Sequence, residues 1–228
     1  MAPHRKLRCL CLHGFTQNAS VFKMKAGGVR KALKAYVDFV YCEAPHNVAG
    51  AFGTSQSVER ADLEEQRRNE LGWWVASESN TRPSQSLYAV GADESIETIR
   101  RACEDEGPFD GLFCFSQGCA VGALALAELA GECVRGDGFA LMVAGFLPWD
   151  QSLRDRVLQN SPLPYNALVV SGSNDALVER SRTEELGECF KSCELHYHNG
   201  GHGIPSDSDF RSKCKRFITD HFDAEEGG

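Results

Sequence analysis

The sequence predicts an α/β protein with a mostly parallel central sheet and helices on both faces of that sheet. The first observation is that short apolar runs of strand length alternate with longer segments of helical periodicity. The second is that the 228 residues, 42% of them hydrophobic and 25% charged, are typical of one soluble globular domain. Strands that alternate with helices pair in parallel and are covered on both sides, and their connections are right-handed.

Each predicted element follows from its own pattern. Strands are predicted for the compact apolar runs, which lie at 7–12, 37–42, 109–115, 139–144, 167–171 and 194–198. Helices are predicted for segments with helical spacing of apolar residues, which lie at 21–36, 94–106, 117–130, 149–159, 178–190 and 207–222. The pair Gly107-Pro108 ends the second of these helices.

These elements predict a single domain over residues 1–222 and a flexible tail at 223–228. Residues 44–90 interrupt the alternation, because they hold many Gly, Ser, Gln and Asn residues and a charged patch but no clear strand. Such a long segment is more often functional than idle, so we predict a lid or substrate-pocket insertion. Its apolar pair, Trp73 and Trp74, either ties the segment to the edge of the sheet or lines a pocket for an apolar acyl group.

The charge balance limits the partners of the protein. Lys and Arg together number 24 and Asp and Glu 32, which gives a formal net charge of −8. Since no long basic run is present, this balance argues against binding to nucleic acid or to an anionic membrane surface. No apolar run approaches the roughly 20 residues that span a bilayer, and the N-terminal apolar stretch does not end in a signal-peptide cleavage site. The sequence therefore predicts a cytoplasmic protein.

The ten cysteines contain no Cys-x-x-Cys pair, so the sequence indicates neither a thioredoxin-type motif nor a zinc ribbon. Several of them lie inside apolar stretches, where a thiol behaves as a small buried hydrophobic group. We therefore expect reduced thiols in the core.

Ser116 lies at the junction of a predicted strand and a predicted helix, in the sequence CFSQG (114–118). A nucleophile on so sharp a turn needs small neighbours two residues before and after it, which is the basis of the G-x-S-x-G nucleophile elbow. Gly118 is present, but Cys114 stands at the first glycine position. Serine is also a favoured N-cap of helices, so this segment alone does not separate a nucleophile from a cap.

Two further residues lie where a nucleophilic serine would need its partners. Asp175 follows the strand predicted at 167–171, and the carboxyl ends of parallel strands gather the site in open α/β sheets. His202 follows the last predicted strand among three glycines, where it is poorly placed for core packing and well placed for presentation on a loop. The order Ser, Asp, His is that of α/β-hydrolases, in which these residues act as nucleophile, acid and base.

An oxyanion hole would need two backbone N–H groups near Ser116. One belongs to Gln117, at the start of the predicted helix, where the helix dipole favours negative charge. The second is expected from the loop after the first strand, and we assign it to Phe15. The side chain of His13 in the same loop is expected to be structural.

Four blocks of the chain resemble the FSH family of serine hydrolases, a group of small α/β-hydrolases that includes the ovarian-cancer-gene-2 esterases. The blocks are CLHGFTQNASVFKMKAGGVRKAL (11–33), GPFDGLFCFSQGCAVGALAL (107–126), VVSGSNDALV (169–178) and HNGGHGIP (198–205). The resemblance covers about residues 7–217 and implies Ser116 as nucleophile, Asp175 as acid and His202 as base. It further implies hydrolysis of carboxylic esters, with thioesters as a related substrate class, through an acyl-enzyme that needs no metal or cofactor.

Three other interpretations stand beside this one. His196, His198 and His202 offer imidazoles to a metal, but no H-E-x-x-H-type helix supports a metal site. Cys114 and Cys119 do not occupy the nucleophile position of the turn. A noncatalytic small-molecule-binding protein on the same fold is the serious alternative, because fold does not imply function. The preferred partner is a small-molecule ester, expected to carry an apolar acyl group.

Overall fold

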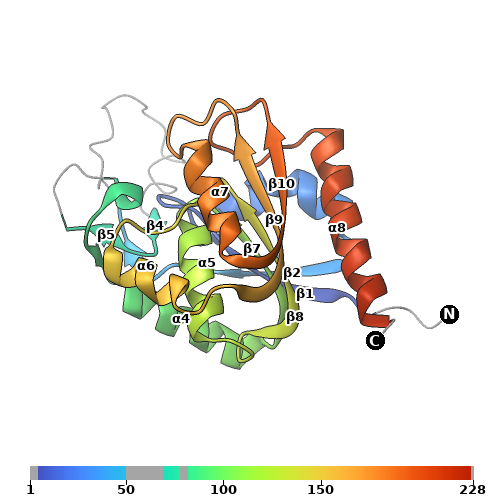
Figure 1. Ribbon diagram of the computed structural model, residues 1–228, viewed down its shortest axis with the longest axis horizontal. Coiled ribbons are helices and arrows are strands. Elements are labelled where there is room, and N and C mark those ends of the chain that lie inside the picture. Colours follow the sequence, from blue (N-terminus) through green and yellow to red (C-terminus); the bar gives the residue numbers. More distant parts are fainter. Residues whose placement is uncertain (1–4, 50–68, 78–81, 227–228) are drawn as a thin grey trace.

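Six parallel strands form the central sheet of the computed structural model, which describes residues 5–49, 69–77 and 82–226 (Figure 1). The strands are β1 (Leu7–Leu12), β2 (Val37–Cys42), β7 (Phe109–Phe115), β8 (Val134–Val143), β9 (Leu163–Gly172) and β10 (Phe190–His198). Their order across the sheet is β10-β9-β8-β7-β1-β2. The chain adds strands in one direction from β1 to β2 and in the other from β7 to β10, so the order reverses between β1 and β7. Open α/β sheets bind ligands beyond the carboxyl ends of the strands at such a reversal.

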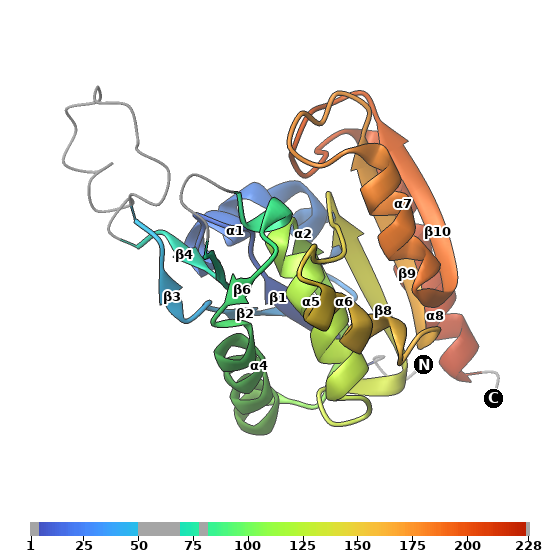
Figure 2. The same cartoon turned by 60° about the vertical axis from the view of Figure 1, so that its left-hand side comes forward.

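Helices cover both faces of the sheet, as the sequence predicts (Figures 1 and 2). One face packs against α4 (Ala92–Glu106), α5 (Gln117–Glu128), α6 (Gln151–Leu158) and α7 (Arg180–Glu188). The other packs against α1 (Ala19–Lys25), α2 (Gly27–Leu33) and α8 (Ser208–Glu226). Helix α5 is buried along almost its whole length because Gly, Ala and other small residues let it lie close to β7 and β1.

The prediction of one continuous helix over residues 21–36 is wrong. Two short helices, α1 and α2, meet instead at Ala26, which is followed by Gly27 and Gly28. Glycine is among the weakest helix formers, so two in succession allow the break. The break turns the chain after Lys25 and leaves that residue at the end of α1.

Several other boundaries differ from the predicted ones. Strands β8, β9 and β10 begin four or five residues before the apolar runs, because ladder hydrogen bonds continue through polar, exposed positions. Helix α8 continues through Glu226, past the predicted boundary at residue 222, so residues 223–226 of the predicted tail are helical. Ala and Glu are strong helix formers, which accounts for the longer helix.

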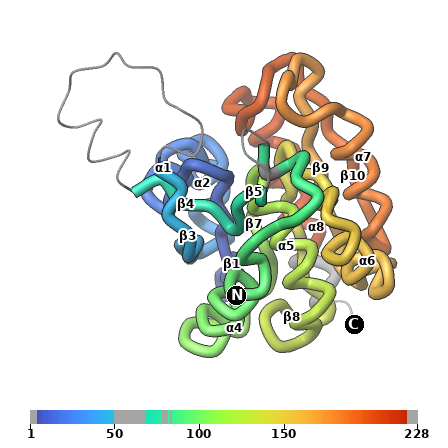
Figure 3. The backbone as a smooth tube through the Cα atoms, turned by 90° about the vertical axis from the view of Figure 1, so that its left-hand side faces the viewer, coloured from blue at the N-terminus to red at the C-terminus, as the bar shows by residue number. Residues whose placement is uncertain are grey.

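The segment between β2 and α4 contains short strands that the sequence does not predict. β3 (His46–Asn47) pairs with β4 (Leu71–Gly72), β5 (Val75–Ala76) pairs with β6 (Ala89–Val90), and the turn η1 covers Pro83–Gln85. The described part crosses the molecule from the loop after β1, where Leu71 donates to the carbonyl of Gln17 (2.9 Å), to the start of α6, where Ala89 donates to Asp150 (2.9 Å) (Figure 3). Residues 50–68 and 78–81 of the predicted lid lie outside the described residues.

A disulfide joins Cys103, near the end of α4, to Cys133, just before β8, with 4.9 Å between their Cα atoms. The expectation of reduced thiols is therefore wrong for this pair. The two cysteines are 30 residues apart, and nothing local in the sequence indicates that they meet. The other eight cysteines are free, and seven of them are buried.

In the part of the chain that the structure describes, no helix combines the length and the apolar character that crossing a membrane requires.

Candidate active site

The turn at Ser116 joins β7 to α5 through a strained backbone. Ser116 has φ = 53° and ψ = −119°, a conformation that costs a non-glycine residue roughly 1–3 kcal/mol. Its N–H donates to the carbonyl of Val143 on β8 (2.9 Å), which holds the turn against the sheet. Its side chain makes no capping hydrogen bond to α5. The geometry thus favours presentation of the Ser116 hydroxyl over a helix cap.

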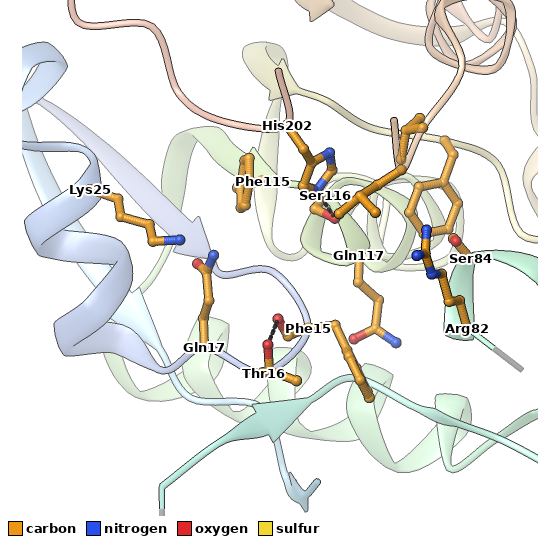
Figure 4. A pocket seen from close by; sticks show the side chains of 13 residues that line it. Phe15, Thr16, Gln17, Lys25, Arg82, Ser84, Phe115, Ser116, Gln117 and His202 are labelled. Atoms are coloured by element: carbon orange, nitrogen blue, oxygen red, sulfur yellow. Dashed lines mark hydrogen bonds between the residues drawn. The ribbon is translucent and has the colours of Figure 1, made fainter. Parts of the chain in front are cut away.

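A chain of hydrogen bonds joins Ser116, His202 and Asp175 (Figure 4 shows the first of them). The Oγ of Ser116 lies 2.9 Å from Nε2 of His202, and Nδ1 of His202 lies 2.8 Å from Oδ2 of Asp175. A carboxylate accepts, so Nδ1–H of His202 donates to Asp175 and leaves Nε2 to accept from the Ser116 hydroxyl. The structure therefore brings all three predicted residues together.

The carboxyl group of Asp175 is held in its ionised form. Its side chain is only 2% exposed, and burial on its own would raise its pKa. Hydrogen bonds from His202 and from the N–H groups of Val178 (2.9 Å) and Leu177 (2.8 Å) outweigh burial, so the pKa of Asp175 lies below its ordinary value. A fixed negative charge thus faces the imidazole ring.

The loops that carry Asp175 and His202 are tied to each other. Asn174 donates from its backbone to the carbonyl of Gly200 (3.1 Å) and from its side chain to that of Asn199 (2.7 Å). A Cβ at Gly172 would lie 2.6 Å from the Gly200 oxygen, so the two loops approach closely only because this residue is glycine. The ring of His202 also packs on Phe115, with 5.1 Å between the ring centroids.

Small residues fit the nucleophile turn against its surroundings. A Cβ at Gly118 would collide with the carbonyl oxygen of Leu12, so α5 starts directly against the end of β1. At the other glycine position of the elbow, the side chain of Cys114 occupies space that α5 leaves open at Gly122: a Cβ there would lie 2.8 Å from the Cys114 sulfur. The structure thus accommodates the departure from G-x-S-x-G.

The loop after β1 passes beside the nucleophile. A Cβ built at Gly14 would lie 3.2 Å from Cβ of Ser116, and Phe15 follows it directly and lines the cavity in front of Ser116. On the other side, Gln117 is the first residue of α5, and no acceptor among the described residues takes its backbone N–H. Both predicted oxyanion donors therefore lie in segments that adjoin Ser116.

The cavity in front of Ser116 and His202 has a volume of about 530 Å³ (Figure 4). Much of its wall is apolar and consists of Phe15, Phe115, Phe146, Leu177 and Val178. Its polar wall consists of Thr16, Gln17, Lys25, Arg82 and Ser84. A cavity of this size and mixed lining fits a small organic ligand.

One wall is braced by Arg182 on α7. Its guanidinium donates to the carbonyl of Ser84 (2.7 Å) and lies 4.8 Å from the ring centroid of Phe146, so it joins the turn η1 to the loop after β8. Burial lowers the pKa of Arg182 from its ordinary value.

Trp73 and Trp74 do not line this cavity. Both are buried in the core, at 0% and 1% exposure, and Nε1 of Trp73 donates to the carbonyl of His13 (2.7 Å). The buried side chain of Gln117 joins the pair to α5, because it accepts from the Trp73 N–H (2.9 Å) and donates to the Trp74 carbonyl (2.9 Å). This position corrects the acyl-pocket interpretation and fits the alternative, in which the pair ties the segment to the sheet.

Neither His13 nor His196 lines the cavity in front of Ser116. His13 is fully buried; Nδ1 donates to the Gly14 carbonyl (2.8 Å) and Nε2 accepts from the Ala44 N–H (3.1 Å). Burial lowers its pKa to about 4, as a structural ring requires. His196 packs on Phe210, and no group of three metal-ligating side chains that could hold an ion occurs among the described residues.

Much of the cavity wall consists of residues that the sequence does not single out. Phe146 lies just beyond β8, and Leu177 and Val178 lie just beyond Asp175, so all three follow the carboxyl ends of strands. That rule could have found them. Lys25 and Arg82 carry no such signal, because the break after α1 and the path of the segment before α4 bring them to the cavity.

The sheet, its covering helices and the strained serine turn define the class of α/β-hydrolases. A family model described as "Serine hydrolase (FSH1)" matches residues 1–214, and the chain belongs to this family of serine hydrolases. Among curated proteins, Esterase OVCA2 of Danio rerio is 34% identical over 224 residues, which cover 93% of this chain and 96% of that one. Esterase OVCA2 of Homo sapiens is 34% identical over 226 residues, which cover 96% and 98%.

Solved structures show the same fold at low sequence identity. SOBER1 of Arabidopsis thaliana has a TM-score of 0.64 at 15% identity, covering 96% of this chain and all of that one. Acyl-protein thioesterase 2 of Zea mays has a TM-score of 0.61 at 18% identity, covering 96% of each chain. At these identities the similarities support the fold alone.

Proposed function

We propose that this serine hydrolase cleaves carboxylic esters through an acyl-enzyme, with Ser116 as nucleophile, His202 as general base and Asp175 as the acid of the triad. The observation that carries the proposal is the continuous hydrogen-bond chain from Ser116 Oγ through His202 to Asp175 at the floor of a cavity. The related proteins named as esterases support the choice of substrate.

In the first half of the reaction, Ser116 attacks the ester carbonyl while His202 Nε2 takes the hydroxyl proton. Asp175 holds the imidazole in the required tautomer and stabilises the imidazolium. The backbone N–H groups of Phe15 and Gln117 bind the oxyanion, and the start of α5 adds a favourable dipole. The tetrahedral intermediate then collapses, and the leaving alcohol takes its proton from His202.

In the second half, water attacks the acyl-enzyme with His202 again as base, which releases the carboxylic acid and restores the Ser116 hydroxyl. Every proton passes through His202, so the proposed reaction needs no metal or other cofactor. A thioester follows the same steps with a thiol as leaving group, which makes thioesters the second substrate class to assay.

A cysteine nucleophile is the weaker candidate. Cys114 and Cys119 are both fully buried, and burial is the main cause that raises the pKa of each thiol above its ordinary value. A raised pKa suppresses the thiolate, which is the reactive form. Neither thiol is within hydrogen-bond distance of His202 in the described structure.

The test is covalent labelling with a fluorophosphonate probe, followed by ester hydrolysis. We expect the wild-type protein to be labelled on Ser116, and Ser116→Ala to lose labelling and several powers of ten in kcat while it stays folded. Cys119→Ala is the matched control and should keep the label. A folded Ser116→Ala protein that is labelled at the wild-type rate would contradict the assignment. A wild-type protein that is neither labelled nor active would favour the noncatalytic binding alternative.

A further inference from the structure

The charges that line the cavity are opposite in sign to the charge of the whole chain. Lys25 and Arg82 are its permanently charged lining residues, and no Asp or Glu lines it in the described part of the chain. The formal net charge of the protein is −8. Neither cation forms an ion pair with a described residue. The cavity therefore offers two positive charges that no described carboxylate neutralises.

The end of the cavity near Lys25 contains a polar group that lacks a partner. Gln17 lines the cavity and is only 7% exposed, and its Oε1 makes no hydrogen bond with any described residue. Figure 4 shows the Lys25 side chain extending toward the amide of Gln17, while Arg82 lies on the opposite side of Ser116. A buried acceptor without a donor costs roughly 1–3 kcal/mol, and a half-turn of the amide would place its NH₂ donors at this position instead.

An amide and an ammonium group together suit a carboxylate. The ammonium supplies charge and the amide NH₂ supplies a second donor once the amide is oriented toward the ligand. The carbon atoms of the same ligand would contact Phe15, Phe115 and Phe146. A neutral apolar ester would instead offer the amide NH₂ no charged acceptor and would leave the two cations without a counterion.

We propose that the cavity selects esters that carry a carboxylate, which Lys25 and Gln17 bind at one end while Arg82 adds positive potential from the other side. This inference rests on the proposed ester hydrolysis and narrows its substrate class. The carboxylate can belong to the acyl group, as in a half-ester of a dicarboxylic acid, or to the leaving alcohol. The shared chemistry is an anionic ester, and the two sources are separated by experiment.

The experiment compares kcat/KM for matched pairs of esters. In the acyl-side pair, the para-nitrophenyl half-ester of glutaric acid is compared with its neutral analogue, para-nitrophenyl valerate. In the alcohol-side pair, the butyrate ester of para-hydroxybenzoic acid is compared with the butyrate of its methyl ester. Each value is divided by the rate of hydroxide hydrolysis of the same ester, and the anionic-to-neutral ratio is the measured quantity.

We expect the wild-type ratio to exceed one for at least one pair and to fall as salt is added, because salt screens partly exposed charges. Lys25→Gln should lower that ratio by about three- to tenfold, the range for one charge a few ångströms from the ligand in a solvent-accessible site, and Arg82→Gln should lower it by a smaller factor because its charge lies farther from the carboxylate. Lys25→Glu should lower the anionic-to-neutral ratio further, while Lys25→Arg, which keeps the positive charge, should retain most of the wild-type ratio.

Lys31→Gln is the matched control, because Lys31 is an exposed lysine on the neighbouring helix α2 and does not line the cavity. A wild-type ratio at or below one for both pairs would overturn the inference. So would a ratio that Lys25→Gln and Arg82→Gln leave unchanged, or one that Lys31→Gln lowers equally. If the protein hydrolyses neither neutral nor anionic esters and Ser116 is not labelled by the fluorophosphonate, the proposed function itself fails. If it hydrolyses neutral and anionic esters equally well, only the inference about the carboxylate is overturned.

Discussion

At the scale of single residues, Cys114 shows how a departure from the usual elbow is accommodated. Its thiol lies on the buried face of β7 that packs against α5, and Gly122 of α5 supplies the space for it. The sizes of the two side chains are coupled, because a Cβ at position 122 would lie only 2.8 Å from the sulfur of Cys114.

This pairing predicts a non-additive effect on stability. Gly122→Ala should lower the free energy of unfolding by about 1–3 kcal/mol, because the core around Cys114 would be overpacked. Cys114→Ala removes the sulfur, so the double variant should be more stable than Gly122→Ala alone. Urea unfolding of the wild-type protein, both single variants and the double variant measures the coupling. Additive effects would show that Gly122 is constrained by something other than Cys114.

The residues of the candidate triad could be found from the sequence because each has a local signal. Ser116 lies at a strand-to-helix junction, Asp175 follows a strand, and His202 lies among glycines. The roles of Trp73 and Trp74 could not be settled in this way. An apolar side chain in a polar segment must be buried, but the sequence does not say whether its neighbours are core residues or a substrate.

At the scale of elements, the short stretch from β4 to β5 is attached to the nucleophile helix. Gln117 contacts both Trp73 and Trp74 through its side chain, and Ser95 on α4 donates to the Trp73 carbonyl. Because the backbone of Gln117 is a proposed oxyanion donor, this attachment also fixes the position of that N–H group.

Replacing Trp73 tests whether the pair is structural. Trp73→Phe keeps most of the buried area but removes the hydrogen bond from Nε1 to the His13 carbonyl, so unfolding should become easier by about 1–3 kcal/mol. The relative kcat/KM values for short and long acyl esters should keep their order. A change in acyl-chain preference without loss of thermal stability would instead indicate that the indole of Trp73 contacts the substrate.

The disulfide predicts a second effect at this scale. A bridge over 30 residues is expected to add about 3.5 kcal/mol by restricting the unfolded chain. Cys133→Ser should therefore lower the unfolding free energy measured without reductant, and dithiothreitol should bring the wild-type protein close to the variant. Titration of the denatured, unreduced protein with a thiol reagent should count eight free thiols out of ten. A count of ten would contradict the bridge.

Most elements were predictable because the buried part of each carries an apolar pattern. The ends of β8 to β10, the break at Ala26 and the two-residue strands β3 to β6 were not. Backbone hydrogen bonds form the strand ends and the short strands, and backbone atoms leave no trace in a pattern of side chains. The break at Ala26 has a signal in Gly27 and Gly28, but the apolar spacing continues across it.

At the scale of the whole molecule, His13 couples folding to pH. Burial is the main cause that lowers its pKa to about 4, against an ordinary value of 6.5. Between these two pH values the unfolded chain binds a proton at this position and the folded chain does not. Stability therefore falls as the pH falls from about 6.5 to about 4, by roughly 3 kcal/mol from this residue.

The measurement is the unfolding free energy in urea at several pH values for the wild-type protein and His13→Gln. We expect the variant to be less stable at neutral pH, since it disturbs the contacts with Gly14 and Ala44, but to lose less stability between pH 6.5 and 4. Equal losses in both proteins would show that other groups cause the acid sensitivity.

Residues 69–77 and 82–91 are joined to the rest of the molecule by the buried tryptophan pair and by several hydrogen bonds to their main chain. Gln17, Gln117, Arg182 and Asp150 contact, in turn, backbone atoms of Leu71, of the tryptophan pair, of Ser84 and of Ala89. Every amino acid carries such a carbonyl group and, except proline, such an N–H group, so the side chains at Leu71, Ser84 and Ala89 can be exchanged with these hydrogen bonds kept, whereas the buried tryptophans cannot. Evolution, or an enzyme engineer, can thus alter the wall that faces the substrate without rebuilding the frame that holds the catalytic groups.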